Sequence, residues 1–266
     1  MPHTRAALRD PVKISTWNVN SLRVRLPHVL AWLDAEHPDL LALQEIKLPD
    51  PDFPAAEFLQ RGYQLAFSGQ KTYNGVALIS RTPLTALQTE IPAFSDPQRR
   101  VLFAETRDIA VLNLYVPNGS EVGSEKYSYK LAWLRHACEF IRALLAGHPR
   151  LVVLGDFNIA PADADVYDPG AWAGQVLCSA PERAAFESLL ALNLADCFRM
   201  FPQPADSYSW WDYRAAAFQR NQGLRIDHIL ASAGLAARCR SCRIDRLPRT
   251  WERPSDHTPV IAEFED

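Results

Sequence analysis

Short apolar segments that each end in polar residues constrain the fold of this chain more than any other feature. The clearest segment covers residues 151–154 (Leu-Val-Val-Leu), and Gly155-Asp156-Phe157-Asn158 follows it directly. A short run without polar residues is typical of a strand that is buried on both faces. Functional side chains collect where such strands end. The pattern therefore predicts a buried sheet with a functional site at one edge.

A second polar pair, Asp256-His257, opens the last apolar segment of the chain at residues 259–264. An Asp-His pair in front of an apolar strand has little structural use, and histidine is a common acid, base or charge stabiliser in catalysis. This pair therefore indicates an enzyme.

The rest of the sequence predicts many strands with a few interposed helices. Strands are expected at residues 13–17, 40–43, 63–67, 75–80, 101–106, 109–115, 151–154, 208–211, 225–230 and 259–264. Helices are expected through residues 29–33, over 130–145 and over 182–192. This mixture implies two stacked β-sheets with helices outside them.

Length and charge limit the alternatives. The chain has 266 residues and no evident linker or repeat, so we expect one domain over residues 12–266 after a short N-terminal extension at 1–11. It carries 28 Lys and Arg against 31 Asp and Glu, a net charge of −3. This balance is not a global signature of nucleic-acid binding, so any such binding requires a local basic face.

The sequence also bears on location. The first dozen residues lack the apolar core of a signal peptide, and no apolar run is long enough to span a bilayer. The five scattered cysteines fit reduced thiols, so we expect a cytoplasmic protein without membrane contact. Cys239 and Cys242 form a Cys-x-x-Cys pair, but no second pair completes a zinc site.

Six polar clusters follow or open apolar strands. They are residues 17–20 (Trp-Asn-Val-Asn), 44–47 (Gln-Glu-Ile-Lys), 115–118 (Tyr-Val-Pro-Asn), 156–158 (Asp-Phe-Asn), 225–228 (Arg-Ile-Asp-His) and 256–257 (Asp-His). One such cluster alone would most often be a turn or a cap. Six in equivalent positions favour one shared active site.

The residue types in these clusters suit the hydrolysis of a phosphodiester. A hard divalent cation needs oxygen ligands, which Glu45, Asn18 and Asp256 could supply. Asp156, with the amide of Asn158 beside it, could orient and deprotonate a water molecule. No nucleophilic side chain is required.

The same chemistry needs groups that stabilise charge on the phosphoryl oxygens. His257, paired with a carboxylate, could do so as a cation, and Tyr115 and Asn118 could donate hydrogen bonds to the same group.

These motifs, in this order, resemble the exonuclease III family of apurinic/apyrimidinic endonucleases, within the endonuclease/exonuclease/phosphatase superfamily. The resemblance extends from about Val12 to Phe264. Its most specific parts are residues 17–20, 43–47, 69–71 with 75–77, 155–159, 223–227 and 255–257. It implies a four-layer αββα sandwich, an α/β fold in which two packed mixed sheets are flanked by helices.

The resemblance also implies roles for single residues. Glu45 would bind Mg²⁺, with Mn²⁺ as a substitute, and Asn18 and Asp256 would lie nearby or at a second metal position. Asp156 would activate water, and Asp227 would orient His257. Because an acidic partner favours the imidazolium, we expect the pKa of His257 to lie above its free value.

Substrate choice is a separate question, because related folds hydrolyse other phosphoesters. In the exonuclease III family, side chains that match Trp210, Leu224 and Ile226 line an apolar pocket, which receives a flipped deoxyribose that has lost its base. The alternative is that these residues belong to the core. The segment at residues 160–178 could form a rim of this pocket, where a bulky residue such as Leu177 could narrow access and shift activity toward 3′ ends.

Basic residues in or near the loops of the site could bind the DNA backbone. They are Lys47, Lys71, Arg100, Lys126, Lys130, Arg214 and Arg220. Taken singly, each is more often a solvated surface charge.

The sequence therefore predicts a metal-dependent DNA repair nuclease. We expect incision 5′ to abasic sites, together with 3′-phosphatase, 3′-phosphodiesterase and 3′→5′ exonuclease activities whose relative rates the sequence leaves open. The expected partner is double-stranded DNA with abasic sites or blocked 3′ ends, bound by a monomer. The alternatives are a phosphatase of the same fold that acts on a small phosphoester, and a non-catalytic DNA-binding protein that kept the fold.

Overall fold

Two six-stranded sheets form the centre of the molecule. The computed structural model describes residues 11–265. The first sheet has the order β11-β12-β1-β2-β4-β3 and the second has the order β5-β6-β7-β8-β10-β9. The strands of the first sheet are β1 (Val12–Asn18), β2 (Leu40–Gln44), β3 (Gln64–Ser68), β4 (Val76–Ser80), β11 (Cys239–Ile244) and β12 (Val260–Phe264). Those of the second are β5 (Thr85–Gln88), β6 (Val101–Thr106), β7 (Ile109–Tyr115), β8 (Leu151–Asp156), β9 (Leu194–Asp196) and β10 (Asp227–Ser232).

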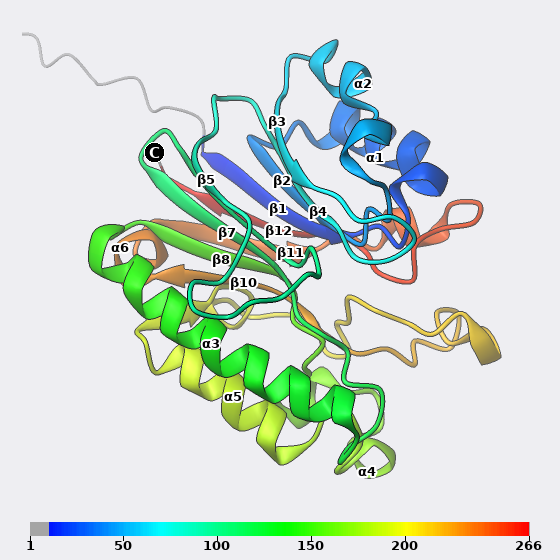
Figure 1. The fold of residues 1–266 in the computed structure, drawn as a ribbon. Coiled ribbons are helices and arrows are strands. Elements are labelled where there is room, and N and C mark those ends of the chain that lie inside the picture. Colours follow the sequence, from blue (N-terminus) through cyan, green and yellow to red (C-terminus); the bar gives the residue numbers. More distant parts are fainter. Residues whose placement is uncertain (1–10, 266) are drawn as a thin grey trace, which may run out of the picture.

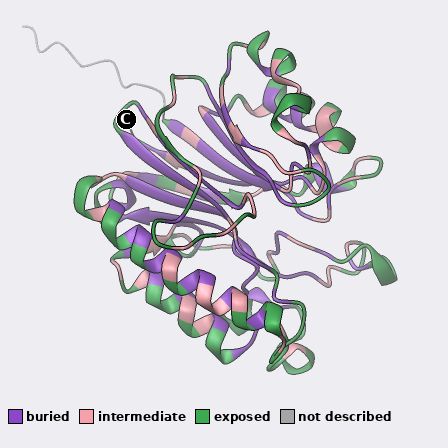
Figure 2. Cartoon of the chain, viewed as in Figure 1, coloured by how far each residue is buried: buried purple, intermediate pink, exposed green. Residues whose placement is uncertain are grey.

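Helices cover the outer faces of the two sheets. α1 (Leu22–Glu36) and α2 (Ala55–Leu59) lie beside the first sheet, and α3 (Glu125–Gly147) and α5 (Ala180–Leu190) lie beside the second (Figure 1). The short helices are α4 (Pro169–Trp172) and α6 (Ala233–Ala236). Most of the strands are buried over most of their length, whereas the helices bury one side only (Figure 2). The predicted four-layer αββα sandwich is confirmed.

The direction of the strands explains where the site forms. Each sheet contains one parallel pair, β1 with β2 and β7 with β8. Parallel strands end at the same edge, so Asn18 and Gln44 end one pair side by side, and Tyr115 and Asp156 end the other. The antiparallel strand β10 starts at this edge, with Asp227 opposite Asp156. Polar strand ends from both sheets therefore meet at one end of the sandwich.

Three strands were not expected from the sequence, and one expected strand is absent. All residues of β5 are exposed, and β11 alternates buried with exposed or partly exposed residues at a sheet edge, so neither has an apolar run. β9 is only three residues long. The strand predicted at residues 208–211 is wrong, because Trp210 makes only isolated bridges, with Leu224 and His257. The predicted strand at 225–230 begins two residues later, at Asp227.

The N-terminal extension predicted at residues 1–11 lies almost wholly outside the described residues. Among residues 11–265, none of the helices combines the length and the apolar character needed to cross a bilayer.

Candidate active site

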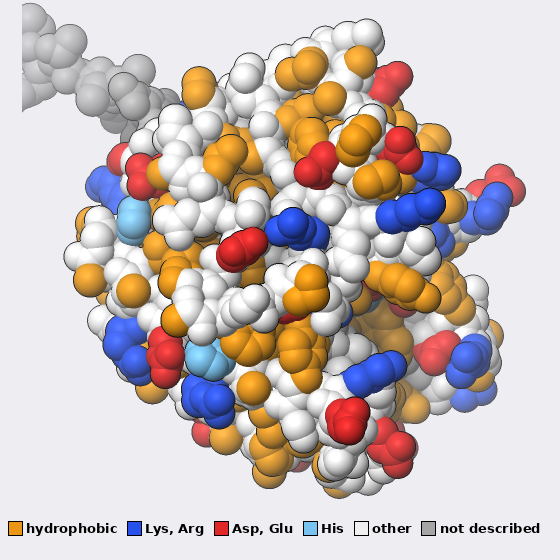
Figure 3. All heavy atoms as spheres, in the orientation of Figure 1, with side chains coloured by type: hydrophobic (Ala, Val, Ile, Leu, Met, Phe, Trp, Pro, Cys, Tyr) orange, Lys and Arg blue, Asp and Glu red, His pale blue; other side chains and the backbone are white. Residues whose placement is uncertain are grey.

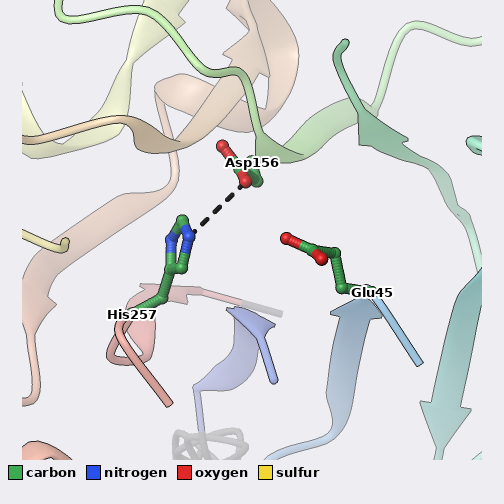
Figure 4. Close-up of side chains that lie close together, drawn as sticks. All are labelled: Glu45, Asp156 and His257. Atoms are coloured by element: carbon green, nitrogen blue, oxygen red, sulfur yellow. Dashed lines mark ion pairs between the residues drawn. The ribbon is translucent and has the colours of Figure 1, made fainter. Parts of the chain in front are cut away.

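Three ionisable side chains converge at the shared edge of the sheets. Glu45 follows β2, Asp156 ends β8 and His257 precedes β12, and the three point toward one another (Figure 4). One ligand atom from each lies within 4.8 Å of the other two. The His257 Nε2 atom lies 3.7 Å from Asp156 Oδ2. Residues from both sheets thus contribute to one site.

His257 is held by a carboxylate on the side away from Asp156. Its Nδ1 lies 2.9 and 3.1 Å from the two carboxylate oxygens of Asp227. Ser209 fixes this carboxylate, since its hydroxyl donates to Asp227 Oδ2 at 2.6 Å. Burial lowers the pKa of His257, but the carboxylates of Asp227 and Asp156 outweigh burial and raise this pKa to about 10. The predicted rise is confirmed, and the imidazolium faces the centre of the site.

Asp156 lies in a buried, hydrogen-bonded position. It is 1% exposed, and its Oδ1 accepts a hydrogen bond from the backbone N–H of Asn158 at 2.9 Å. Its Oδ2 accepts from the side-chain amides of Asn18 and Asn158, at 2.8 and 3.3 Å. Burial raises the pKa of Asp156 to about 7, although the His257 charge acts in the opposite direction. A carboxylate with a pKa near neutrality is suited to take a proton from water.

Asn18 connects the two carboxylates of the site. Its Nδ2 donates to Glu45 Oε1 and to Asp156 Oδ2, each at 2.8 Å. Its Oδ1 accepts from the backbone N–H of Asn20 at 2.9 Å. The oxygen that we expected to bind a metal is therefore turned to the backbone, and Asn18 instead bridges the two acids.

Asp256 is also placed differently from the metal ligand that we expected. Its Oδ1 accepts a hydrogen bond from the side chain of Asn20 at 2.9 Å, and its Oδ2 accepts one from the indole N–H of Trp210 at 3.1 Å. Burial raises the pKa of Asp256, but His257 and these two donors outweigh burial and lower it. Asp256 is not part of the cluster around Glu45. Its carboxylate instead fixes the loop that carries Trp210.

Asn118 and Tyr115 lie beside the cluster, as the motifs predicted. The Nδ2 of Asn118 donates to Asn158 Oδ1 at 3.1 Å. Burial and the nearby carboxylates of Glu45 and Asp156 raise the pKa of Tyr115 well above its usual value. The phenol therefore keeps its proton and can act as a hydrogen-bond donor.

The acidic groups of the cluster fit a hard cation. Glu45 offers carboxylate oxygens, and the nearby Asp156 carboxylate adds negative charge that attracts a cation to this position. Lys47 already neutralises part of this charge, since its Nζ lies 2.9 Å from Glu45 Oε2. His257 is not suited as a ligand, because metal binding requires a neutral imidazole. Glu45 is held with a φ of 52°, a strained backbone conformation of the kind that is concentrated at functional sites.

The residues expected to line a sugar pocket are largely covered. Leu224 and Ile226 are 0% and 1% exposed, and they share an apolar cluster with Val166 and Leu177. Trp210 is partly exposed and packs against this cluster. The segment at residues 160–178 therefore places its side chains where we expected an open pocket.

The basic residues expected at the DNA backbone divide into exposed residues and residues that have hydrogen-bond or ion-pair partners within the protein. Lys71, Lys126 and Arg214 are exposed, as is Arg220. Arg100 is 9% exposed, and its guanidinium donates to Gln98 and to the carbonyl of Tyr115.

Lys47 and Lys130 also have partners within the protein. Lys47 is engaged by Glu45 and by Asn20, and Lys130 is fully buried. On the face that Figure 3 shows, Lys and Arg side chains are interspersed with acidic ones. Arg100 and Lys126 line a hollow of about 370 Å³ that also contains Asn118.

Comparison with known proteins identifies the family. Residues 15–257 match the endonuclease/exonuclease/phosphatase family. The chain belongs to this family. Exodeoxyribonuclease III of Haemophilus influenzae is 35% identical over 95% of the chain and all of the relative.

Solved structures of the same type are also similar. The 3′ phosphatase NExo from Neisseria, bound to a product DNA hairpin, is 49% identical with a TM-score of 0.94, over 96% of this chain and 100% of that chain. An AP endonuclease from Archaeoglobus fulgidus is 37% identical with a TM-score of 0.92, over the same shares. Within the endonuclease/exonuclease/phosphatase family, the chain is thus a DNA repair nuclease of the exonuclease III type, as its motifs predicted.

Sequence reasoning missed the roles of three residues of this site. Asn20 joins Lys47 and Asp256, Ser209 orients Asp227, and Lys130 supports the loops from within the core. Asn20 belongs to the polar cluster at residues 17–20, and it could have been found because it is a second asparagine two positions after Asn18. The role of Ser209 carries no signal in the sequence, because its partner is distant along the chain. Lys130 was expected at the DNA backbone, but it is buried and bonds to distant parts of the chain instead.

Proposed function

We propose that this nuclease hydrolyses DNA phosphodiesters through a water molecule activated by Asp156, with His257 as the cation that stabilises the phosphoryl oxygens. The observation that carries the proposal is the arrangement Asp227, His257, Asp156. An imidazolium fixed by one buried carboxylate faces a second carboxylate whose pKa lies near 7. A base and a charge stabiliser are thus held side by side before substrate binds.

Asn158 and Asn118 support the same reaction. The amide of Asn158 bonds to Asp156 and keeps its carboxylate aimed at the site. Asn118 and Tyr115 can donate hydrogen bonds to the phosphoryl group. Glu45, with Asp156 near it, would hold Mg²⁺ or Mn²⁺, which would neutralise charge on the phosphate and the leaving oxygen. We assign the proton transfer to Asp156, which accepts the proton of the attacking water molecule.

For the substrate, we propose double-stranded DNA with blocked 3′ ends or abasic sites, with the 3′ ends processed faster. The burial of Leu224 and Ile226 supports the faster processing of 3′ ends, because an internal abasic sugar would have to displace the packed side chain of Leu177. A 3′ phosphate group is smaller and needs no flipped sugar. The 49% identical Neisseria structure is a 3′ phosphatase, which agrees with this order.

We further propose a monomer that acts as a single domain and that works in the cytoplasm, associated with the nucleoid through its DNA substrate. The five cysteines are all free thiols, which suits a reducing compartment. Lys71, Lys126 and Arg214 are the exposed cations proposed to contact the DNA backbone.

The test uses two labelled duplexes, one with a nick that carries a 3′ phosphate and one with an internal tetrahydrofuran abasic analogue. We expect Mg²⁺-dependent removal of the phosphate, slower cutting at the analogue, and loss of both with EDTA. Asp156→Asn should lower kcat by about a thousand-fold or more on both duplexes, because it removes the general base. Asp34→Asn, an exposed change on α1, serves as the control. Hydrolysis of small phosphoesters without competition by duplex DNA would contradict the proposal.

A further inference from the structure

A lysine and a glutamate form a buried ion pair behind the active-site loops. Lys130 lies on α3 and Glu182 on α5, and both side chains are 0% exposed. Burying two charges is unfavourable unless the geometry and further hydrogen bonds compensate. Such a pair is weak evidence for stability by itself, so its other contacts must indicate what it does.

The ammonium of Lys130 is fully used. Its Nζ donates to the backbone carbonyls of Asn158 at 2.6 Å and Asn118 at 3.0 Å, and to the Glu182 carboxylate. Three acceptors surround three N–H donors, which requires the charged form of the side chain. Asn158 has a φ of 50°, in the left-handed region, so an external bond to its carbonyl helps to fix this turn. Lys130 thus holds the two asparagines whose side chains contact each other in the active site.

The carboxylate of Glu182 is also fully hydrogen-bonded, and its partners are Leu177, in the rim segment, and Ser179, just after it. Its Oε1 also accepts from the backbone N–H of Leu177 at 3.0 Å, and its Oε2 accepts from the N–H and the hydroxyl of Ser179. Leu177 has a φ of 73°, a conformation that a leucine adopts only when its surroundings impose it. Its carbonyl accepts from the N–H of Ala160 at 2.8 Å. The Leu177 turn is therefore fixed at both of its backbone groups.

We propose that the Lys130–Glu182 pair is a positioning device that sets the catalytic loops and the pocket rim together. Lys130 places Asn158 and Asn118 for the reaction, and Glu182 keeps Leu177 packed in the apolar cluster with Leu224. Neither residue touches the substrate. This inference rests on the proposed function, which it deepens by naming a determinant of substrate choice.

The test compares Lys130→Met, Glu182→Gln and the double variant Lys130→Met/Glu182→Met on the two duplexes described above. Lys130→Met should lower kcat by about ten- to hundred-fold on both substrates with little change in KM, because small displacements of reacting groups are costly. Glu182→Gln should raise the rate ratio of abasic cutting to 3′-phosphate removal by about three-fold or more, because it loosens the rim. Arg135→Met, exposed on the same helix, is the matched control.

The double variant keeps the test decisive if a lone buried charge prevents folding. Replacing a buried ion pair by apolar residues of similar volume is often tolerated. The double variant should fold, as judged by near-ultraviolet circular dichroism. It should also show both the loss of kcat and the altered ratio of abasic cutting to 3′-phosphate removal. Folded variants that keep kcat within about two-fold and an unchanged ratio would mean that the pair is only structural, and would overturn the inference. If the wild type cleaves neither duplex, the proposed function fails and this inference fails with it.

Discussion

At the scale of single residues, the site depends on charges that are buried and matched in pairs. His257 lies between Asp227 and Asp156, and the position of Asp227 is set by the hydroxyl of Ser209. Without its carboxylate neighbours, burial would favour the neutral imidazole. Asp227, with support from Asp156, therefore makes His257 a cation at neutral pH.

Asp227→Asn should change the pH dependence of the reaction. The Asp227 carboxylate raises the pKa of His257, so its removal lowers this pKa, and the imidazolium is lost at a lower pH than in the wild type. Because the cation is the active form, the deficit of the variant in kcat/KM should grow as pH rises, toward about a hundred-fold above neutrality. The measurement is a pH profile with the 3′-phosphate duplex. A deficit that is the same at all pH values would show that Asp227 acts only by orienting the ring.

At the scale of elements, a second buried ion cluster holds the rim segment to the strand that carries Asp227. Arg225 is 1% exposed and pairs with Asp165 at 2.6 Å and Asp196 at 2.8 Å, and its guanidinium also contacts His228. Burial raises the pKa of Asp165, but Arg225 outweighs burial and lowers it. This cluster connects the 3₁₀ turn at Asp163–Asp165 to β9 and β10.

Arg225→Met should destabilise the protein by about 3–5 kcal/mol, because it leaves Asp165 and Asp196 buried with less compensation. Urea denaturation followed by fluorescence measures this change. Arg23→Met is the control, since Arg23 and Asp52 form an exposed pair that should contribute little. A loss for Arg225→Met no larger than that of the control would mean that solvent or neighbouring groups already compensate the two acids.

The elements also show how far the sequence could predict the structure. Buried strands such as β4 and β8, and the strand ends that carry Glu45, Asp156 and His257, were predictable because apolar runs and polar clusters are local patterns. Edge strands such as β5 lack that pattern because they are exposed on both faces. The roles of Asn18, Asp256 and the covered Leu224 depend on which atoms face one another across the fold, and no spacing in the sequence encodes this.

At the scale of the whole molecule, the site exists only because the two sheets pack in one alignment. Glu45 comes from the first sheet and Asp156 from the second, so a shift between the sheets would separate them. Besides the Asn18–Asp156 hydrogen bond, a second buried polar bridge crosses the interface near this edge. The Nε2 of Gln44 donates to Asn113 Oδ1 at 2.8 Å, and the Nδ2 of Asn113 donates to the carbonyls of Leu43 and Ala77 at 3.0 Å. A polar contact between apolar sheets is directional, and it specifies their alignment more narrowly than apolar packing does.

Asn113→Ala and Val111→Ala separate alignment from stability. The two residues lie two positions apart on β7, so their side chains share one face, and both are 0% exposed. Each truncation should destabilise the protein by about 1–3 kcal/mol, through unpaired polar groups in one case and a cavity in the other. Only Asn113→Ala should also lower kcat and weaken metal-dependent activation, because it alone removes the bridge beside Glu45. The measurements are urea denaturation and rates titrated with Mg²⁺ for the folded variants. Equal effects of both substitutions on kcat would show that apolar packing, and not this bridge, sets the sheets in register.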